Sequence, residues 1–331
     1  MPSDRASILV TAAGAEGTAG KILGLRDAGY RVVAVDTDPE ATGLYLADQA
    51  YVVPPGQSPE YVPEITRICA AERIRAIVPL VDEELVAVWA LARLGIQILL
   101  PHADLVTRCL DKLTLMEFLD EAGVSVPRTR LATRGTEDLA FPVIGKPRRG
   151  RGSRGVFLAR DPSELKEAMG RSATEPDQII VQEYVTGPEF SVSVVAWRDR
   201  RIQAVVPKEV VFKNGSSRYA ISRHDSVVTE ECVKAAHALD ADGPLNVQLR
   251  VDASGTPYVF EINPRFSGSA ILTAAAGVDE IGGLLAQALD DHRSVVRDSW
   301  HEGVAMIRHS TETFVAEPAF TDRHRSLERN S

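Results

Sequence analysis

The segment VFEINPRFSGS, residues 259–269, places a carboxylate and an amide inside a strand of otherwise apolar character. In a β-strand, Glu261 and Asn263 would point to one face, while Phe260 and Ile262 would point into the opposite layer. An isolated carboxylate at such a position is costly unless a cation or a hydrogen-bonding group accompanies it. The segment therefore predicts a strand with one buried apolar face and one polar face that carries a site.

A neighbouring strand supplies another polar group. In LNVQLRVDASGTPYVFEIN, residues 245–263, the DASG turn predicts an antiparallel hairpin that brings Gln248 toward Glu261 and Asn263. Oxygen donors of this kind suit Mg²⁺, which takes few protein ligands and completes its shell with phosphate and water. Arg265, just beyond the strand, could neutralise charge on a transferring phosphoryl group. The alternative is a buried polar cluster whose members satisfy each other by hydrogen bonds, and we favour the metal.

A glycine-rich loop lies in the middle of the chain. In GKPRRGRGSRGV, residues 145–156, Lys146 ends a strand and is followed by Gly150, Gly152 and Gly155. Glycines let backbone N–H groups point at a polyphosphate, and the lysine adds a point charge. The loop is not a Walker A motif, because it joins two strands and contains no GK[ST]. A solvated hairpin tip with exposed arginines is the alternative, and the polar hairpin downstream favours phosphate binding.

The chain changes character along its length. Its first hundred residues alternate strands (SILVTAA, YRVVAVD, AIVPLV, IQILLP) with helices over Thr18–Ala28, Tyr61–Glu72 and 83–95, which indicates a parallel sheet covered on both faces. Later strands are long, alternating and antiparallel. We expect a parallel α/β domain at 1–103, a helical linker at 104–128, a small α+β unit at 129–185, a larger antiparallel unit at 186–315 and a flexible tail at 316–331.

Glycines near the start of the chain resemble a dinucleotide-binding motif. Gly14, Gly17 and Gly20 follow a strand and open a helix, and Asp36 ends the next strand. Their spacing is G-x-x-G-x-x-G rather than G-x-G-x-x-G, so the motif is weak. We favour tight strand-to-helix packing without a nucleotide, although the helix N-terminus at Thr18 could hold an anion.

Composition excludes several classes of function. The 331 residues carry a formal net charge of −9, with a hydrophobic fraction of 44%, so a nucleic-acid partner has no electrostatic support. Cys69, Cys109 and Cys232 form no CxxC pair, which favours a reducing compartment. No apolar run reaches about 18 residues, and the start of the chain has no leader pattern, so we expect a cytoplasmic protein without a membrane partner.

Several motifs in order resemble one superfamily. Lys146 with its glycine loop, then QEYVTGPEFS, NVQLRVD and FEINPRFSGS, are similar to the ATP-grasp superfamily, above all to relatives of the carbamoyl phosphate synthase large subunit and biotin carboxylase. The resemblance runs from about Ile8 to Val315. It implies an α/β fold in which ATP sits between two α+β lobes, one of them a mobile lid, preceded by a Rossmann-like pre-ATP-grasp domain.

The resemblance also implies roles for individual residues. ATP and Mg²⁺ would be the cofactors, with Mn²⁺ as a possible substitute. Gln248 and Glu261 would hold one Mg²⁺, and Glu261 and Asn263 a second, while Arg265 would stabilise the γ-phosphate in transit together with Lys146. The residues implied to contact ATP are Lys112 and Lys146 at the phosphates, Gly150, Gly152, Ser153 and Gly155 in the loop above them, Glu183, Tyr184 and Val185 at the adenine, and Glu189 at the ribose.

Some of these assignments keep alternatives. Lys112 could be a surface lysine, and Glu189 a solvated hinge residue. Substrate contacts are expected at Glu16, Lys208, Arg223, Arg265, Ser267 and Gly268. For Lys208, Arg223 and the adjoining His224, a solvated loop is an equally good explanation.

The leading hypothesis is an ATP-dependent ligase that activates a small, amino-acid-like carboxylate as an acyl phosphate and joins it to an amine. A single ATP-grasp unit and the basic RRGRGSR loop weigh against carbamoyl phosphate or carboxybiotin formation. The rivals are a nicotinamide-dependent dehydrogenase that uses the N-terminal glycines and a non-catalytic nucleotide-binding regulator. Relatives are often dimers, so a homodimer is possible.

Overall fold

The computed structural model describes residues 5–291 and 295–320. Within these residues the chain forms two compact units. The first comprises residues 5–100, 268–291, 295–300 and 307–320, and the second comprises 101–267 and 301–306. Residues 268–291 and 295–300 were expected in the same unit as the antiparallel strands. They pack instead with the first unit, because α1 and α9 lie against each other there.

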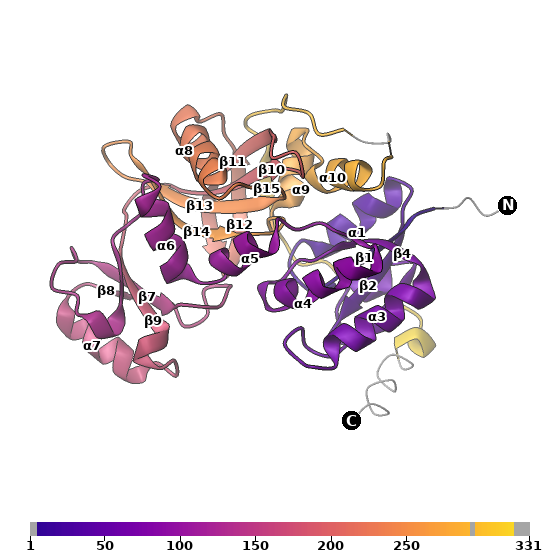
Figure 1. Cartoon of the computed structure of the whole chain (residues 1–331), viewed down its shortest axis with the longest axis horizontal. Coiled ribbons are helices and arrows are strands. Elements are labelled where there is room, and N and C mark those ends of the chain that lie inside the picture. Colours follow the sequence, from indigo (N-terminus) through magenta and orange to yellow (C-terminus); the bar gives the residue numbers. More distant parts are fainter. Residues whose placement is uncertain (1–4, 292–294, 321–331) are drawn as a thin grey trace. The chain divides into compact units, whose positions relative to one another are not determined.

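The first unit is built on a parallel sheet, as predicted (Figure 1). Its strand order is β3-β2-β1-β4-β5, with bounds β1 Ser7–Val10, β2 Arg31–Asp36, β3 Gln49–Val52, β4 Ile74–Val78 and β5 Gln97–Ile98. The apolar β1 and β2 occupy central places, where both faces are covered. The sequence did not reveal β3, because its four residues QAYV are only half-buried at the sheet edge.

Helices connect these strands. They are α1 Thr18–Asp27, α2 Gly43–Leu46, α3 Tyr61–Glu72, and α4 Leu85–Trp89 between 3₁₀ turns Asp82–Glu84 and Ala90–Leu94. Two helices from later in the chain, α9 Ala270–Ala276 and α10 Glu280–Ala288, belong to the same unit. The predicted bounds of α3 are confirmed, and α1 ends one residue earlier than expected. The helix predicted at 83–95 is divided between α4 and the turns that flank it.

The second unit contains a small antiparallel sheet. Its order is β6-β9-β7-β8, with bounds β6 Thr129–Leu131, β7 Val143–Pro147, β8 Phe157–Ala159 and β9 Ile179–Glu183. Helix α7, Pro162–Arg171, packs against one face through Leu165, which shares a core with Val143, Ala159 and Val181. The glycine-rich loop, residues 148–155, joins β7 to β8, so its predicted strand–loop–strand setting is confirmed.

A larger antiparallel sheet forms the rest of this unit. Its order is β14-β13-β10-β11-β12-β15, with bounds β10 Glu189–Ala196, β11 Ile202–Asn214, β12 Ser216–Ser222, β13 Leu245–Val251, β14 Pro257–Asn263 and β15 Ala305–Ile307. Helices α5 Ala103–Cys109, α6 Lys112–Glu121 and α8 Ser226–Ala238 contribute to the apolar core on one face. Phe190, Val192 and Val194 of β10 point into this core, so the intervening side chains face the opposite side.

One element of the opening segment departs from simple alternation. Gln248 pairs with Glu261, but Leu249 pairs with Val259, so β14 bulges and Phe260 is the extra residue. Val259 and Ile262 are both buried in the core, whereas Phe260 is half-buried and does not belong to it. The prediction that Phe260 points into the core layer with Ile262 was therefore wrong.

The described part of the expected tail, residues 316–320, begins a helical turn. Ala316 accepts hydrogen bonds from the backbone of Ala319 and Phe320, and the Phe320 ring stacks on Tyr45 at 6.5 Å between centroids. Residues 321–331, also predicted to be flexible, lie outside the described residues. Across the described part of the chain, no helix combines the length and apolar character that crossing a membrane requires.

Candidate functional site

Polar residues line up in rows on the face of the large sheet that turns away from the helices. Ser191 of β10, Gln248 of β13 and Glu261 of β14 stand side by side in register. The next row along the strands holds Ser193, Asn246 and Asn263. The predicted convergence of Gln248 with Glu261 follows directly from this register, since side chains of an opposed antiparallel pair lie about 5 Å apart at Cβ.

The Gln248–Glu261 pair is available for a ligand. Within residues 5–291 and 295–320, neither side chain takes part in a hydrogen bond or ion pair. Gln248 and Glu261 therefore do not satisfy each other by a hydrogen bond, which favours a bound ligand over a self-satisfied polar cluster. A carboxylate and an amide oxygen at the same register fit a hard cation that also binds phosphate. In the described part of the chain, no group of three or more His, Cys, Asp or Glu side chains is arranged so that it could hold a metal ion. Among the three predicted ligands, Glu261 is the carboxylate, and Gln248 and Asn263 supply amide oxygens.

Asn263 and Arg265 lie at the end of the same strand. The Arg265 guanidinium donates to Oδ1 of Asn263 at 3.3 Å and to the carbonyl of Phe266 at 3.3 Å. Asn263 is buried, and a metal ion bound to its amide oxygen would share that oxygen with the Arg265 guanidinium. The arginine is held beside the predicted metal ligands, as the segment suggested.

Lys146 links the small sheet to the large one. Its ammonium donates to Oε1 of Gln182 at 2.9 Å and to the carbonyl of Phe260 at 3.0 Å. The pKa of Lys146 is lowered to about 8, mainly because the side chain is buried. The charges of Lys112 and Lys213 also lower this pKa, and the Glu261 carboxylate opposes the change. The predicted phosphate lysine therefore lies near Glu261, on the polar side of the large sheet.

The start of α6 contacts the glycine-rich loop. Lys112 is buried, so the surface-lysine alternative is wrong, and its ammonium donates to the carbonyl of Gly150 at 2.5 Å. Gly150, Gly152 and Gly155 all have positive φ values, and Ser153 has a φ of 58°. Such a backbone favours glycine and leaves amide groups free of side-chain obstruction.

The residues assigned to the nucleoside lie where β9 ends and β10 begins. Glu183 ends β9 and accepts a hydrogen bond from the amide of Ala140 at 2.8 Å, and the Tyr184 ring lies 5.2 Å from the guanidinium of Arg250. Val185 follows in the connection to β10. These three residues thus lie at and just beyond the C-terminal end of β9, an internal strand of the small sheet.

Glu189 is buried at the start of β10, so the solvated-hinge alternative is wrong. Its carboxylate pairs with Lys213 at 2.6 Å and with Arg250 at 2.5 Å. A ribose hydroxyl at this position would have to share the carboxylate with these two cations. Neither Lys213 nor Arg250 stood out in the sequence, because each occupies an ordinary strand position.

The substrate candidates of the second unit divide into buried and exposed groups. Lys208 is fully buried in β11 and donates to the hydroxyl of Ser193 at 2.6 Å, so a solvated loop is excluded for it. Ser267 is buried too, with its hydroxyl 3.5 Å from that of Ser191. Arg223 is partly exposed and pairs with Glu209 at 2.8 Å. His224 follows it in the connection from β12 to α8, and its amide donates to Glu302.

The other substrate candidates lie in the first unit. Glu16 pairs with Arg308 at 3.2 Å, and the same guanidinium donates to the carbonyl of Gly268 at 3.0 Å. A Cβ on Gly17 would lie 2.5 Å from that carbonyl, and the residue has a φ of +79°. Glu16 and Gly268 are therefore brought together, with Arg308 as a residue that the sequence did not suggest.

The N-terminal glycines are accounted for by packing. A Cβ on Gly14 would lie 3.0 Å from Ala41, and one on Gly20 would lie 3.1 Å from Ile271. Asp36, the expected ribose ligand of a dinucleotide, accepts hydrogen bonds from the amides of Gly14 and Asp38. These contacts support the packing interpretation over a dinucleotide site.

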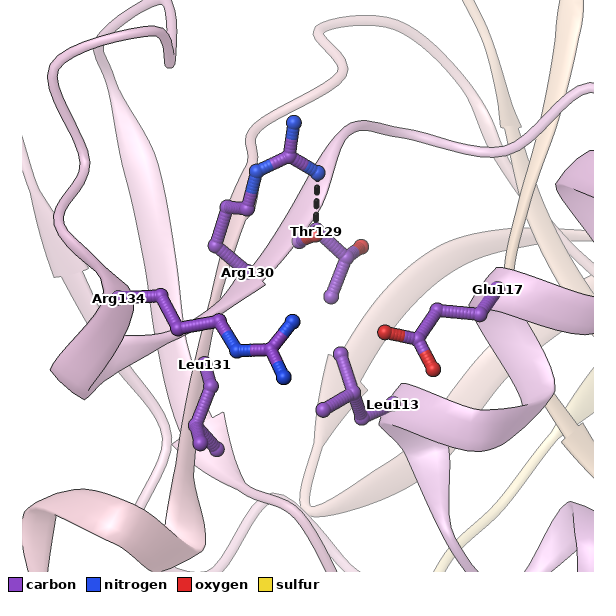
Figure 2. Close-up of a pocket in the computed structure, with 6 residues that line it drawn as sticks. All are labelled: Leu113, Glu117, Thr129, Arg130, Leu131 and Arg134. Atoms are coloured by element: carbon purple, nitrogen blue, oxygen red, sulfur yellow. Dashed lines mark hydrogen bonds between the residues drawn. The ribbon is translucent and has the colours of Figure 1, made fainter.

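A separate pocket lies between α6 and the edge of the small sheet (Figure 2). Its lining residues are Leu113, Glu117, Thr129, Arg130, Leu131 and Arg134. Figure 2 shows Glu117 and Arg134 pointing toward the pocket from opposite sides, while Arg130 turns away and donates to the carbonyl of Thr129 at 3.1 Å. Its charged residues are exposed, and none of the predicted site residues lines it.

Comparison with known families finds matches for two parts of the chain. Residues 175–311 match the family model described as ATP-grasp in the biosynthetic pathway with Ter operon. This part of the chain is thus similar to an ATP-grasp domain. Residues 8–98 match the PylC-like N-terminal domain. Together the two matches confirm the resemblance to the ATP-grasp superfamily that the motifs indicated.

Relatives and solved structures agree with the ATP-grasp domain. A carbamoyl-phosphate synthase of Methanobrevibacter smithii is 24% identical over 292 residues, 80% of this chain and 76% of that protein. The biotin carboxylase domain dimer of 2-oxoglutarate carboxylase from Hydrogenobacter thermophilus, solved with magnesium ADP and bicarbonate, has a TM-score of 0.71 at 20% identity, covering 88% and 72% of the two chains. The L-amino acid ligase of Bacillus licheniformis has a TM-score of 0.68 at 18% identity, covering 86% and 74%. The predicted ATP-grasp fold is thus confirmed.

Two residues of the second unit escaped sequence reasoning although they hold predicted ones in place. Gln182 bonds Lys146, and it also donates to the hydroxyl of Thr129 at 2.8 Å. Asp111 precedes Lys112 and pairs with Arg148 at 2.7 Å. Asp111 had a usable signal, because an aspartate before a helical run is a common N-cap. Gln182 had none, since a glutamine within a buried strand is not specific.

Proposed function

We propose that this protein is an ATP-dependent ligase that converts a small carboxylate into an acyl phosphate and joins it to an amine, releasing ADP and phosphate. The observation that carries the proposal is the Gln248–Glu261 pair, which stands in register near Lys146 and makes no side-chain hydrogen bond within the described residues. A self-satisfied structural cluster would have used these groups. A magnesium–nucleotide site needs them free.

The chemistry has two steps. A carboxylate oxygen of the substrate attacks the γ-phosphorus of ATP, the bond from that phosphorus to the bridging oxygen of ADP breaks, and an acyl phosphate forms. The nitrogen lone pair of the amine then attacks the acyl carbon. Phosphate departs with the former carbon–oxygen bonding pair, the nitrogen loses a proton, and an amide remains. Neither step needs a covalent enzyme intermediate.

The side chains would act through position and charge. Lys146, Lys112 and the amides of the glycine-rich loop would hold the phosphates, and Arg265 would stabilise the γ-phosphoryl group during transfer. Gln248, Glu261 and Asn263 would hold Mg²⁺, which neutralises charge on the phosphate oxygens when it is bound. We propose two ions with Glu261 between them, and Mn²⁺ as a substitute. Closure of the small sheet as a lid would keep water from the acyl phosphate.

The substrate class is also part of the proposal. The similar fold of an L-amino acid ligase supports an amino-acid-like carboxylate. Glu16, Lys208, Arg223, Ser267 and Gly268 are the proposed contacts for the carboxylate and amine substrates. A homodimer is proposed because the biotin carboxylase domain with a similar fold was solved as one. Light scattering of the purified protein would test it, with twice the monomer mass expected.

An ADP-release screen tests the proposal. Pairs of carboxylates and amines, amino acids first, are incubated with the protein, ATP and Mg²⁺, and ADP is detected by a coupled assay. At least one pair should stimulate ADP release well above the rate with ATP alone, and Glu261→Ala should abolish the stimulation while its circular dichroism spectrum stays unchanged. Tight ATP binding without turnover for any pair would favour the regulator instead. Binding of NAD(H) in place of ATP would favour the dehydrogenase.

A further inference from the structure

The base of the glycine-rich loop is tied to the first turn of α6. Asp111 accepts a hydrogen bond from Nε of Arg148 at 2.7 Å and lies 3.4 Å from a guanidinium nitrogen of Arg149. The amide of Lys112 donates to the carbonyl of Arg148 at 3.0 Å, and the Lys112 ammonium donates to that of Gly150 at 2.5 Å. Four contacts thus join two adjacent helix residues to three adjacent loop residues.

Asp111 performs two tasks at once. Its carboxylate is the N-cap of α6, where it accepts a hydrogen bond from the amide of Thr114 at 3.3 Å, and it is 8% exposed. Burial alone would raise the pKa of this carboxyl, but the hydrogen bonds from Arg148 and Thr114 and the charges of Arg148 and Arg149 lower it. The carboxylate therefore stays charged near neutral pH, and its bond to Arg148 is charge-assisted.

The contact leaves the phosphate-binding groups usable. A lysine ammonium has three N–H donors, so its bond to Gly150 leaves Lys112 able to reach a phosphate oxygen as well. Gly152, Ser153 and Gly155, farther along the loop, remain exposed. Because the base of the loop is already fixed, the loop loses less conformational entropy when it becomes ordered over a nucleotide.

We propose that Asp111 is a positioning residue for the nucleotide: by holding Arg148 and Arg149 against the N-terminus of α6, it sets the loop and Lys112 as one preformed phosphate cradle. We call the contacts of Asp111 with Arg148 and Arg149 the latch. The inference rests on the proposed function for its link to ATP, whereas the existence of the latch does not. Asp111 touches neither the reacting atoms nor the metal ligands. Its loss should weaken ATP binding rather than slow the chemical step.

The first experiment measures the latch without any nucleotide. Asp111→Asn keeps an N-cap acceptor, because Asn caps helices about as well as Asp, but removes the charge that holds the arginines. The control is Asp161→Asn, since Asp161 caps α7 through the amides of Ser163 and Glu164 and has no arginine partner within the described residues. Trypsin cuts after arginine, so we expect cleavage after Arg148 and Arg149 to become several-fold faster in Asp111→Asn and to stay unchanged in Asp161→Asn.

The second experiment measures ATP by titration calorimetry, and by steady-state kinetics once an active substrate pair is known. Asp111→Asn should bind Mg-ATP about tenfold more weakly, with kcat at saturating ATP within about twofold of the wild type. Arg148→Gln should behave likewise, and Arg148→Lys, which keeps the charge, should recover part of the affinity. Arg148→Gln also serves if Asp111→Asn fails to fold.

The outcomes separate the two ideas. If wild-type protein does not bind ATP, the proposed function fails, and the trypsin experiment still decides whether the latch exists. Equal trypsin rates in Asp111→Asn and wild type would overturn the latch. Faster cleavage with unchanged ATP affinity would overturn the positioning role.

Discussion

The ammonium of Lys146 donates a hydrogen bond to the carbonyl oxygen of Phe260, the residue that the β-bulge inserts beside Glu261. A lysine from the small sheet thereby reaches the strand that carries the proposed metal ligands. The bulge turns the Phe260 ring out of the core and brings it to 5.5 Å from the same ammonium. The extra residue in β14 thus makes the contact between Lys146 and the strand that carries the proposed metal ligands.

This lysine should make ATP binding depend on pH. With a pKa lowered to about 8 by burial, Lys146 is mostly protonated at pH 7 and mostly neutral at pH 9 in the free protein. Since the charged form attracts phosphate, we expect the Kd for ATP to rise about tenfold between these values. Lys146→Arg, which stays charged, should remove that rise. Calorimetry across the pH range checks this, and a parallel rise in both proteins would assign the titration to another group.

Metal dependence should follow the register of the polar rows. Glu261→Gln removes the only carboxylate of the donor set, so we expect Mg²⁺-dependent ADP release to fall about 100-fold or more. Gln248→Leu removes a neutral donor and should raise the Mg²⁺ concentration needed for half-maximal activity by about tenfold. Asp199→Asn, in an exposed turn, serves as the control. An unchanged Mg²⁺ requirement in Glu261→Gln would remove it from the metal site.

The buried Gln182 should contribute to stability as well. Gln182→Met leaves the hydroxyl of Thr129 and the ammonium of Lys146 each short of a partner in a buried region, at a cost of about 1–3 kcal/mol in unfolding free energy. Gln178→Met, at an exposed position, should stay within about 0.5 kcal/mol of the wild type. Urea denaturation followed by circular dichroism measures both. Equal stability of the two variants would show that the Gln182 bonds do not matter.

Two glycines of α1 and its N-cap should respond in opposite ways to alanine. Gly17→Ala forces a left-handed backbone and a close approach to the carbonyl of Gly268, and should destabilise by about 1–3 kcal/mol. Gly24 lies inside the helix with open space around it, so Gly24→Ala should stabilise by about 0.5–1 kcal/mol. Thermal or urea denaturation distinguishes them. Similar effects of both substitutions would contradict the packing explanation of the glycine motif.

Strand alternation allowed much of the site to be predicted. In β13 and β14, apolar side chains fill the core, and the polar residues between them include Gln248, Glu261 and Asn263. Alternation could not reveal the bulge at Phe260, because the extra residue has no glycine or proline to mark it and its position depends on the partner strand. The same limit applies to Lys208, whose burial comes from neighbours distant in sequence.

Contacts between segments far apart in the chain were the least predictable part. Glu84, for example, is fully buried at the end of the parallel strands, where Tyr61 donates to it at 2.7 Å and Thr11 also bonds it. Burial raises its pKa, and the hydrogen bonds that it accepts work against that rise. The sequence showed only an acidic turn at this position, since nothing local indicates which of three adjacent acids is enclosed.

The central claim is that the protein activates a carboxylate through an acyl phosphate at the Gln248–Glu261 pair. Once the screen has found an active pair, the carboxylate substrate is prepared with ¹⁸O in its carboxyl group, and the inorganic phosphate released with Mg-ATP is examined by mass spectrometry. We predict that one ¹⁸O atom appears in phosphate for each turnover, and that Glu261→Gln shows no transfer. Turnover that leaves all of the label out of the phosphate would contradict the claim.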